Sequence, residues 1–264
     1  MARYGCTVTV AAGKIPSSES NFSWLITEDN LPTAAIDGGA QSILNGGGNL
    51  RCYTDYTKAT QIAIEVVSFV TGGTPNIQVW GLSSTLAVAS TVYIEADTVA
   101  VAQSVVTDTY GRNAVWADHE LVIHQGTVID SKGNHTPALV GAPSLVDMMW
   151  GGQGYDLNSG QYITVPHTAS LNIEENYTTN AWVKYATAGG SVRSVIAKLN
   201  SGNSDGFWML ALGDILRSRH PDLTTANLDF SSTLANGTIY RLGSDMDGTT
   251  RKAIVDTSFT SDTP

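Results

Sequence analysis

Hydrophobic and polar positions along the chain follow a β-type pattern almost throughout. Short runs rich in β-branched and aromatic residues recur between turn residues, whereas the 3.6-residue periodicity of an amphipathic helix is almost absent. Many short strands at close spacing are typical of β-sandwiches and barrels. The sequence therefore predicts an all-β chain, with clear strands at residues 6–11, 62–69, 77–80, 91–96, 161–165, 178–185, 192–198, 207–212, 239–242 and 251–255.

Glycine-rich clusters separate these strands. The chain has 26 glycines, and many lie where a backbone of positive φ can reverse direction: residues 38–39, 46–49, 72–75, 151–152 and 200–203. Residues 108–119 include a turn signal at 110–113, so we expect a linker there instead of a helix. A boundary near residue 115 predicts two consecutive antiparallel β-sandwich domains of ordinary size, residues 1–115 and 116–264.

Composition and charge exclude several classes of partner. Charged residues make up only 14% of the 264 residues, and 24 acids against 14 bases give a formal net charge of -10. Phosphate binding needs a concentrated basic face, so this balance argues against nucleic acid and against an electrostatic membrane anchor. There is no run of about 18 apolar residues, so we expect no membrane insertion. The hydrophobic content of 42% is ample for a folded core.

The N-terminus and the two cysteines bear on the compartment. Residues 1–16 alternate polar with apolar positions and lack the apolar stretch of a secretion signal, so we interpret them as the first strand of the fold. Cys6 and Cys52 fit two arrangements, neighbours on adjacent strands or two buried, reduced thiols. Without a secretion signal the second arrangement is favoured. Two cysteines without a CxxC motif do not form a zinc site by themselves.

Two patterns resemble catalytic motifs, but each lacks a feature that the motif requires. His119-Glu120 and His124 resemble the zinc signature HExxH, but the histidines are five residues apart and would point to opposite faces of a strand. Glu95 and Asp97 resemble the start of the E-x-D-x-x-E run of sandwich-fold glucanases, but the closing acid is missing. We therefore interpret the two acids as a solvated strand end.

The remaining sequence patterns also indicate no catalysis. The nucleophile elbow G-x-S-x-G and the phosphate-binding P-loop do not occur. Residues 245–248, Asp-Met-Asp-Gly, resemble half of a calcium loop, but the glycine is too early, and Asp-Gly before a β-run favours a hairpin turn. The prediction is a protein that is not an enzyme and has no catalytic residues, metal site or cofactor.

The second half of the chain resembles a known family. Residues 154–166 (Gly-Tyr-Asp-Leu-Asn-Ser-Gly-Gln-Tyr-Ile-Thr-Val-Pro) are similar to the "F-D-G-x-x-D-Y-I-x-V-P" strand pair of laminin-G-like, concanavalin A-type sandwiches. Further segments match the family in the same order: residues 169–173, 178–184, 196–198, 206–210 and 247–256. The resemblance implies a laminin-G-like jelly roll. The family continues well past the last of these hairpins, so the sandwich is either completed by a neighbouring subunit or reduced, with an exposed edge.

The first half resembles a β-rich domain of unknown function. Residues 24–32 and 50–55 are similar to two of its segments, and residues 110–116 occupy the place of its short link to a laminin-G-like domain. Such pairs occur in bacterial surface proteins and in structural proteins of tailed bacteriophages. The missing secretion signal favours the virion, assembled in the host cytoplasm, over the bacterial cell surface.

These observations predict a function in binding and assembly. The first hypothesis is a virion structural or adhesion protein, such as a decoration, fibre or tail-associated subunit, which forms oligomers and contacts other assembly subunits. The alternative is a carbohydrate-binding module that recognises host or cell-surface glycans by stacking aromatic side chains on sugar rings. Trp150, beside Gly151-Gly152, is the candidate platform. Trp182 and Trp208 lie in apolar strand runs, and we expect them in the core.

Overall fold

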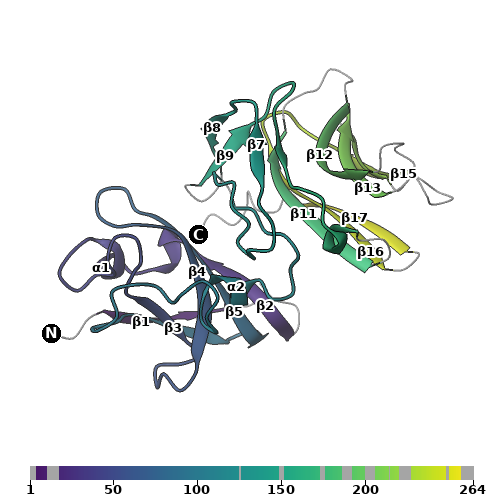
Figure 1. Ribbon diagram of the computed structural model, residues 1–264. Helices are drawn as coiled ribbons and strands as arrows, with labels where there is room; N and C mark the ends of the chain where they lie inside the picture. The colour runs from purple at the N-terminus through teal and green to yellow at the C-terminus, as the bar shows by residue number, and fades with distance from the viewer. Residues whose placement is uncertain are drawn as a thin grey trace. The chain divides into compact units, whose positions relative to one another are not determined.

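The computed structural model describes residues 4–10, 18–124, 126–148, 152–172, 176–185, 192–199, 206–213, 215–219, 227–247 and 250–256. Antiparallel strands dominate the chain, which confirms the predicted all-β class (Figure 1). The chain divides into two compact units, Met1–Pro166 and His167–Pro264. The predicted boundary near residue 115 falls inside the first unit, and the two predicted domain ranges stay a prediction. None of the described helices is long and apolar enough to cross a membrane.

The first unit is built on a six-stranded sheet in the order β1-β6-β3-β4-β5-β2. Its strands are β1 (Gly5–Thr9), β2 (Glu19–Ile26), β3 (Leu50–Tyr53), β4 (Gln61–Val70), β5 (Asn76–Leu86) and β6 (Thr91–Ala96). Two smaller pairs follow, β7 (Ala138–Val140) with β10 (Tyr162–Thr164), and β8 (Ser144–Asp147) with β9 (Gln153–Asp156). Short helical turns are η1 (Glu28–Asn30), α1 (Thr33–Ile36) and α2 (Arg112–Val115).

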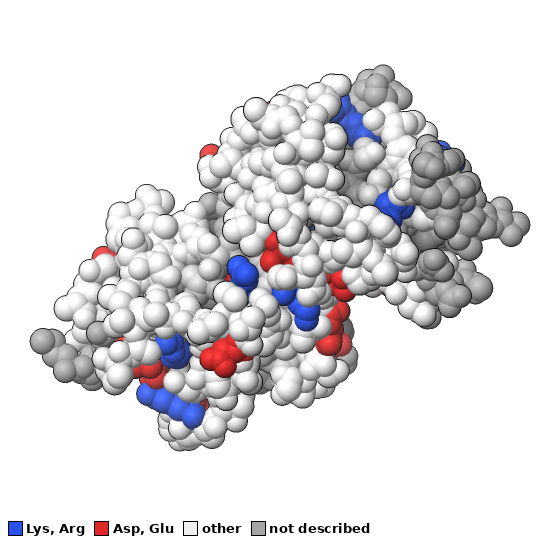
Figure 2. Space-filling view, viewed as in Figure 1, with Lys and Arg blue, Asp and Glu red and all other residues white. Residues whose placement is uncertain are grey.

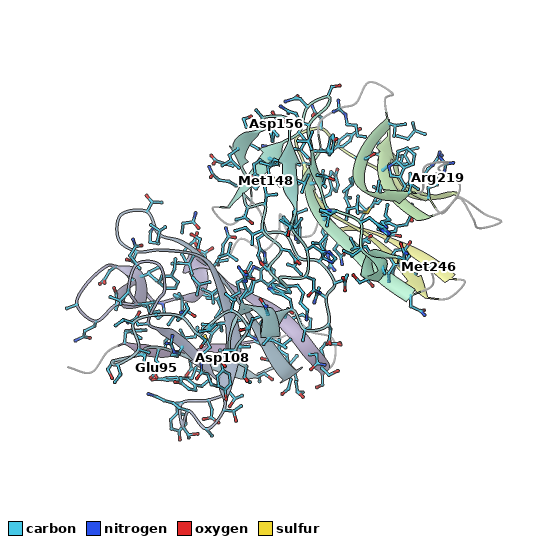
Figure 3. The ribbon with its side chains drawn as sticks, in the orientation of Figure 1. Glu95, Asp108, Met148, Asp156, Arg219 and Met246 are labelled. Carbon is cyan, nitrogen blue, oxygen red and sulfur yellow. The ribbon has the colours of Figure 1, made fainter. Side chains whose placement is uncertain are left out.

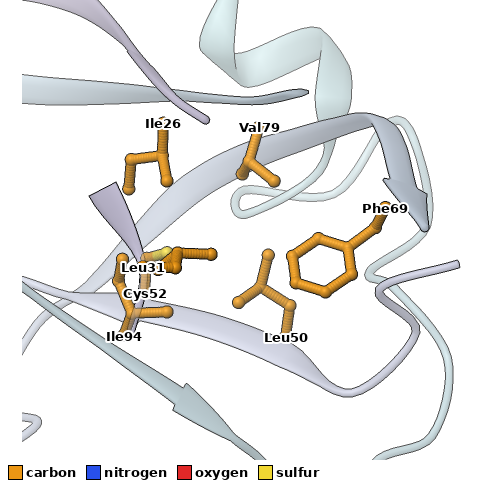
Figure 4. Close-up of a pocket in the computed structure, with 7 residues that line it drawn as sticks. All are labelled: Ile26, Leu31, Leu50, Cys52, Phe69, Val79 and Ile94. Carbon is orange, nitrogen blue, oxygen red and sulfur yellow. The ribbon is translucent and has the colours of Figure 1, made fainter. Parts of the chain in front are cut away.

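This six-stranded sheet curls around its own core. Ile26 on β2 and Ile94 on β6 are four strand spacings apart, about 19 Å in a flat sheet. Both nevertheless line the same apolar centre, together with Leu50, Phe69 and Val79 (Figure 4). These side chains leave no room for a water molecule. The curl therefore closes the core of the first unit without a second large sheet.

A β-bulge in β4 contributes to the curl. The register between β4 and β5 shifts between Val66 and Ser68, so Val67 is an extra residue on β4. Such an extra residue bends the strand and increases its local twist. The segments of β4 before and after Val67 therefore face different parts of the unit.

The two cysteines lie on the same sheet but not on adjacent strands. Cys6 on β1 and Cys52 on β3 both pair with Ile94 of the strand between them. Two strand spacings separate them by about 10 Å, beyond the Cα distance of about 4.4–6.8 Å that a disulfide allows. Both thiols are free, and burial raises the pKa of Cys52. The adjacent-strand alternative is therefore wrong.

The second unit is a sandwich of two sheets. One has the order β11-β16-β17 and the other β12-β13-β14-β15. The strands are β11 (Asn176–Lys184), β12 (Val192–Leu199), β13 (Gly206–Leu212), β14 (Ile215–Arg219), β15 (Asn227–Thr233), β16 (Ile239–Asp247) and β17 (Thr250–Asp256), after a short turn η2 (Ala169–Leu171). Met209 and Leu216 from one sheet pack in one core with Tyr240 and Leu242 from the other. The laminin-G-like jelly roll within this class stays a prediction.

Two local predictions can be compared with the strands. Asp247 on β16 pairs with Thr250 on β17, which confirms the hairpin predicted at residues 245–248. The linker predicted at residues 108–119 is partly wrong, because residues 112–115 form α2. This helix packs on the first sheet: Val115 and Trp116 share a small core with Ala63 of β4.

Candidate functional site

The first unit contains an open polar cleft. Its volume is about 280 Å³, and its lining comes from three places along the chain. Strands β4 and β5 form one part, the loop after His124 forms a second, and the β8–β9 hairpin forms the third. The lining residues are Val67, Ser68, Asn76, Gln78, Gly126, Thr127, Asp147, Gly152 and Gln153.

The bulge in β4 places part of this lining. Val67 is the extra residue, and the next residue, Ser68, pairs with Gln78 on β5. The Ser68 hydroxyl donates a hydrogen bond to the Asn76 carbonyl oxygen over 3.1 Å. In another part of the lining, Asp147 pairs with Gln153 across the β8–β9 hairpin. The cleft thus lies between a bulged strand pair and a hairpin, both of which are hydrogen-bonded elements.

The lining of the cleft is polar but almost uncharged. Six of the nine described residues that line the cleft carry a hydroxyl, amide or carboxylate, and Asp147 is the single charged residue among these nine. On the face of the protein shown in Figure 2, uncharged residues likewise dominate and the acidic and basic side chains are interspersed. A site of this kind can both donate and accept hydrogen bonds, and it does not attract anions by a positive charge.

Trp150, the predicted glycan platform, lies outside the described residues. Met148 and Asp156, which precede and follow it in the sequence, are labelled in Figure 3. Trp150 therefore stays a prediction. Trp182 and Trp208 are half-buried, so their placement in the core is wrong. The Trp208 indole lies on a polar face of its sheet, where its N–H donates to Ser194 Oγ over 2.9 Å and the Arg219 guanidinium lies 5.8 Å from its centroid.

A buried carboxylate beside α2 is a second notable feature of the first unit. Glu65 lies on β4, and only 6% of its side chain is exposed. Its Oε2 accepts hydrogen bonds from Trp116 Nε1 over 2.6 Å and from His124 Nε2 over 2.7 Å. Its Oε1 accepts one from Ser131 Oγ over 2.6 Å. Three donors from one later segment therefore converge on a single strand carboxylate, which fastens that segment to the sheet.

Aromatic rings and a second carboxylate complete this cluster. The His124 ring stacks on Trp80 at 5.7 Å between centroids and lies 5.4 Å from the Trp116 ring. The buried Asp130 accepts backbone hydrogen bonds from residues 122, 132, 134 and 135 at 2.8–3.0 Å. These bonds fold residues 119–135 into a compact loop, which also carries Gly126 and Thr127 to the cleft.

The arrangement around Glu65 favours structure over catalysis. In nucleophilic catalysis an imidazole accepts the proton of a hydroxyl or thiol. Here Ser131 donates to the carboxylate, and His124 bonds to the other oxygen of the same carboxylate. Among the described residues, no group of three or more His, Cys, Asp or Glu side chains is placed to hold a metal ion.

The histidines and acids of the two incomplete motifs have separate partners. His119 packs edge-on against Trp116 at 5.1 Å, while Glu120 Oε1 bonds to His135 Nε2 over 2.7 Å. Glu95 forms an ion pair with Lys58. Asp97 accepts the backbone N–H groups of residues 99 and 100 at 2.7 and 3.2 Å. None of these contacts brings the motif residues together.

The ionisation of Glu65 predicts a specific loss of stability in acid. Burial alone would raise the pKa of this carboxyl, but the hydrogen bond and charge of His124, with the bonds from Ser131 and Trp116, hold the pKa below its ordinary value of 4.5. A depressed folded-state pKa stabilises the fold above the unfolded-state value, and this stabilisation is lost as the pH falls through the folded-state value. We expect wild type to lose its advantage in urea midpoint over Glu65→Gln as the pH falls below about 4.5. Parallel curves for the two proteins between pH 7 and pH 3 would contradict the assignment.

From the sequence, Glu65 was not identified as the centre of a buried network. It is the single charged residue in the predicted strand 62–69, and an isolated acid in an apolar run is a usable signal for a buried partner. Its three donors lie 51, 59 and 66 residues away along the chain, so no local motif contains them. Comparisons of the chain with protein-family models, with curated proteins and with solved structures give no match.

Proposed function

We propose that this protein is a non-catalytic structural or adhesion subunit that works through protein–protein contact, and that the contact joins copies of this chain. The observation that carries the proposal is a well-anchored loop with exposed valines, here named the valine loop, residues 97–111. In it Val99, Val101 and Val105 are 86%, 62% and 68% exposed. The virion, with a bacterial cell surface as the alternative, is the setting that the resemblance implies.

The valine loop is held to the sheet at several points. Arg51 Nη2 donates to the Ala102 carbonyl over 2.7 Å, and Gln103 Nε2 donates to the Leu50 carbonyl over 3.2 Å. At the far end the backbone N–H of Asn113 donates to the Val106 carbonyl over 2.9 Å. The loop therefore has defined anchors on both sides of its exposed valines.

Two glycines allow this close approach to the rest of the unit. A Cβ atom on Gly48 would lie 2.2 Å from the Val101 carbonyl oxygen, and one on Gly111 would lie 2.0 Å from that of Val105. Neither position accepts a side chain without a shift of the backbone. The backbone of the loop is thus packed inward while its valine side chains point outward.

Exposed valines in an anchored loop are costly unless a partner covers them. Full burial of a valine side chain contributes about 1.5–3 kcal/mol. Large exposed apolar patches on a folded protein mark protein–protein contact sites, and three highly exposed valines lie within seven residues of this loop. The valine loop is therefore the surface that we assign to self-association, and symmetric copies can cover it with the same loop.

Light scattering tests this proposal. We expect the purified protein to form oligomers, with a mass of at least twice the 27.9 kDa of one chain. Replacing Val99 and Val105 by serine should weaken the association by about 100-fold or more, because two buried apolar groups are lost. Tyr56→Ser is the matched control, since Tyr56 is 76% exposed and lies outside the loop. A monomeric wild type, or a doubly substituted protein with unchanged mass, would overturn the proposal.

A further inference from the structure

We propose that the polar cleft of the first unit binds one neutral sugar residue of a glycan. This site is independent of the valine loop and goes beyond the role in assembly. Carbohydrate binding is the alternative function that the sequence predicts, but the sequence places it at Trp150. The cleft assigns it to other residues: Ser68, Gln78, Thr127, Asp147 and Gln153.

The donors and acceptors of the cleft match those of a sugar. Each sugar hydroxyl both donates and accepts, and amide and hydroxyl side chains do the same. Gln153 supplies an exposed amide and Asp147 a strong acceptor. The hydroxyls of Ser68 and Thr127 already donate to backbone carbonyls, so each supplies an oxygen that accepts. Hydrogen bonds to a charged group such as Asp147 are about twice as strong as those between neutral groups.

The same lining disfavours other small ligands. Phosphate, sulfate and carboxylate ligands need a positive group. Among the described residues no Lys, Arg or His lines the cleft, and Asp147 repels anions. Apolar ligands need a hydrophobic wall. Of the described lining residues, Val67 alone has a large apolar side chain.

Volume and position also fit a sugar residue within a longer chain. The cleft measures about 280 Å³, just below the range of about 300–1,000 Å³ for small-molecule sites. It is open to solvent, so the neighbouring residues of a glycan can extend out of it. The bulge at Val67 is consistent with this role, because bulges redirect side chains and are frequent next to binding sites.

The test is a titration with neutral oligosaccharides. A glycan array containing neutral glucose, galactose, mannose and N-acetylglucosamine oligosaccharides identifies a binder, which calorimetry then titrates into the full chain. We expect Asp147→Ala and Gln153→Ala each to weaken binding about tenfold or more, since each removes a hydrogen-bonding group from the site. Both side chains are exposed, so the variants should retain the thermal unfolding midpoint of wild type.

Matched controls separate this proposal from the role in assembly. Asp156→Ala changes an exposed acid on the same hairpin that does not line the cleft, so it should bind like wild type. The Val99→Ser, Val105→Ser protein should also retain sugar binding, whatever its mass. The proposal is overturned if no neutral glycan binds, if anionic glycans alone bind, or if binding does not depend on Asp147 and Gln153.

Discussion

Replacing Glu65 by alanine should lower the free energy of unfolding by about 3–5 kcal/mol, because the change removes the shared acceptor of a buried network. Trp116 Nε1, His124 Nε2 and Ser131 Oγ would each lose a partner. A buried donor that is left unsatisfied costs about 1–3 kcal/mol by itself. Urea denaturation at pH 7 measures the loss.

Two controls show whether the network or the charge is responsible. Glu65→Gln keeps the shape and one acceptor oxygen, so we expect a smaller loss than for alanine. Glu95→Ala removes an acid that is paired with Lys58 near the surface, where ion pairs contribute about 0–1 kcal/mol. If Glu65→Ala is no more harmful than Glu95→Ala, then Glu65 does not fasten the loop of residues 119–135 to the sheet.

Replacing Leu216 by alanine should destabilise the second unit by about 2–5 kcal/mol, the range for truncating a fully buried leucine. Leu216 lies on β14 and is 0% exposed. It packs with Met209 and Leu242 between the two sheets. Removing its side chain loses the transfer free energy of the deleted atoms. It also leaves a cavity, and the residues that line the cavity lose close contacts. Urea denaturation of the variant measures this loss.

The neighbouring residue supplies the matched control. Ile215 directly precedes Leu216 on the same strand, but its side chain points the other way and is 44% exposed. Ile215→Ala should cost less than about 1 kcal/mol. Equal losses for the two variants would mean that the alternation of β14, and with it the sandwich of the second unit, is assigned incorrectly.

The strands that the sequence predicted are those with a strong local signal. All ten predicted strands are present, among them β4 with Ile62 and Ile64 and β13 with Phe207 and Met209. Two of the missed strands lack such a signal. β8 (Ser144–Asp147) is exposed along its whole length, and β14 (Ile215–Arg219) has two arginines in five residues. Their strand conformation depends on pairing with neighbours more than on their own composition.

The positions of the functional features depend on contacts between residues far apart in the sequence. The sequence pattern did not predict that His119 would pack on Trp116. It did not indicate that His124 would bond to Glu65, 59 residues earlier. The cleft likewise combines residues of β4 with the β8–β9 hairpin, some 80 positions later in the chain.

The sequence by itself therefore determined the all-β class, ten of the strands and the β16–β17 hairpin. These features depend on alternation and turn residues within about ten positions, which a single segment contains. The tertiary structure alone decided which strands are neighbours, and so separated Cys6 from Cys52, gathered three donors at Glu65 and formed the cleft at the bulge. A shift of one residue in strand pairing turns every side chain to the opposite face. Such placements follow from long-range register, which no local pattern in the sequence specifies.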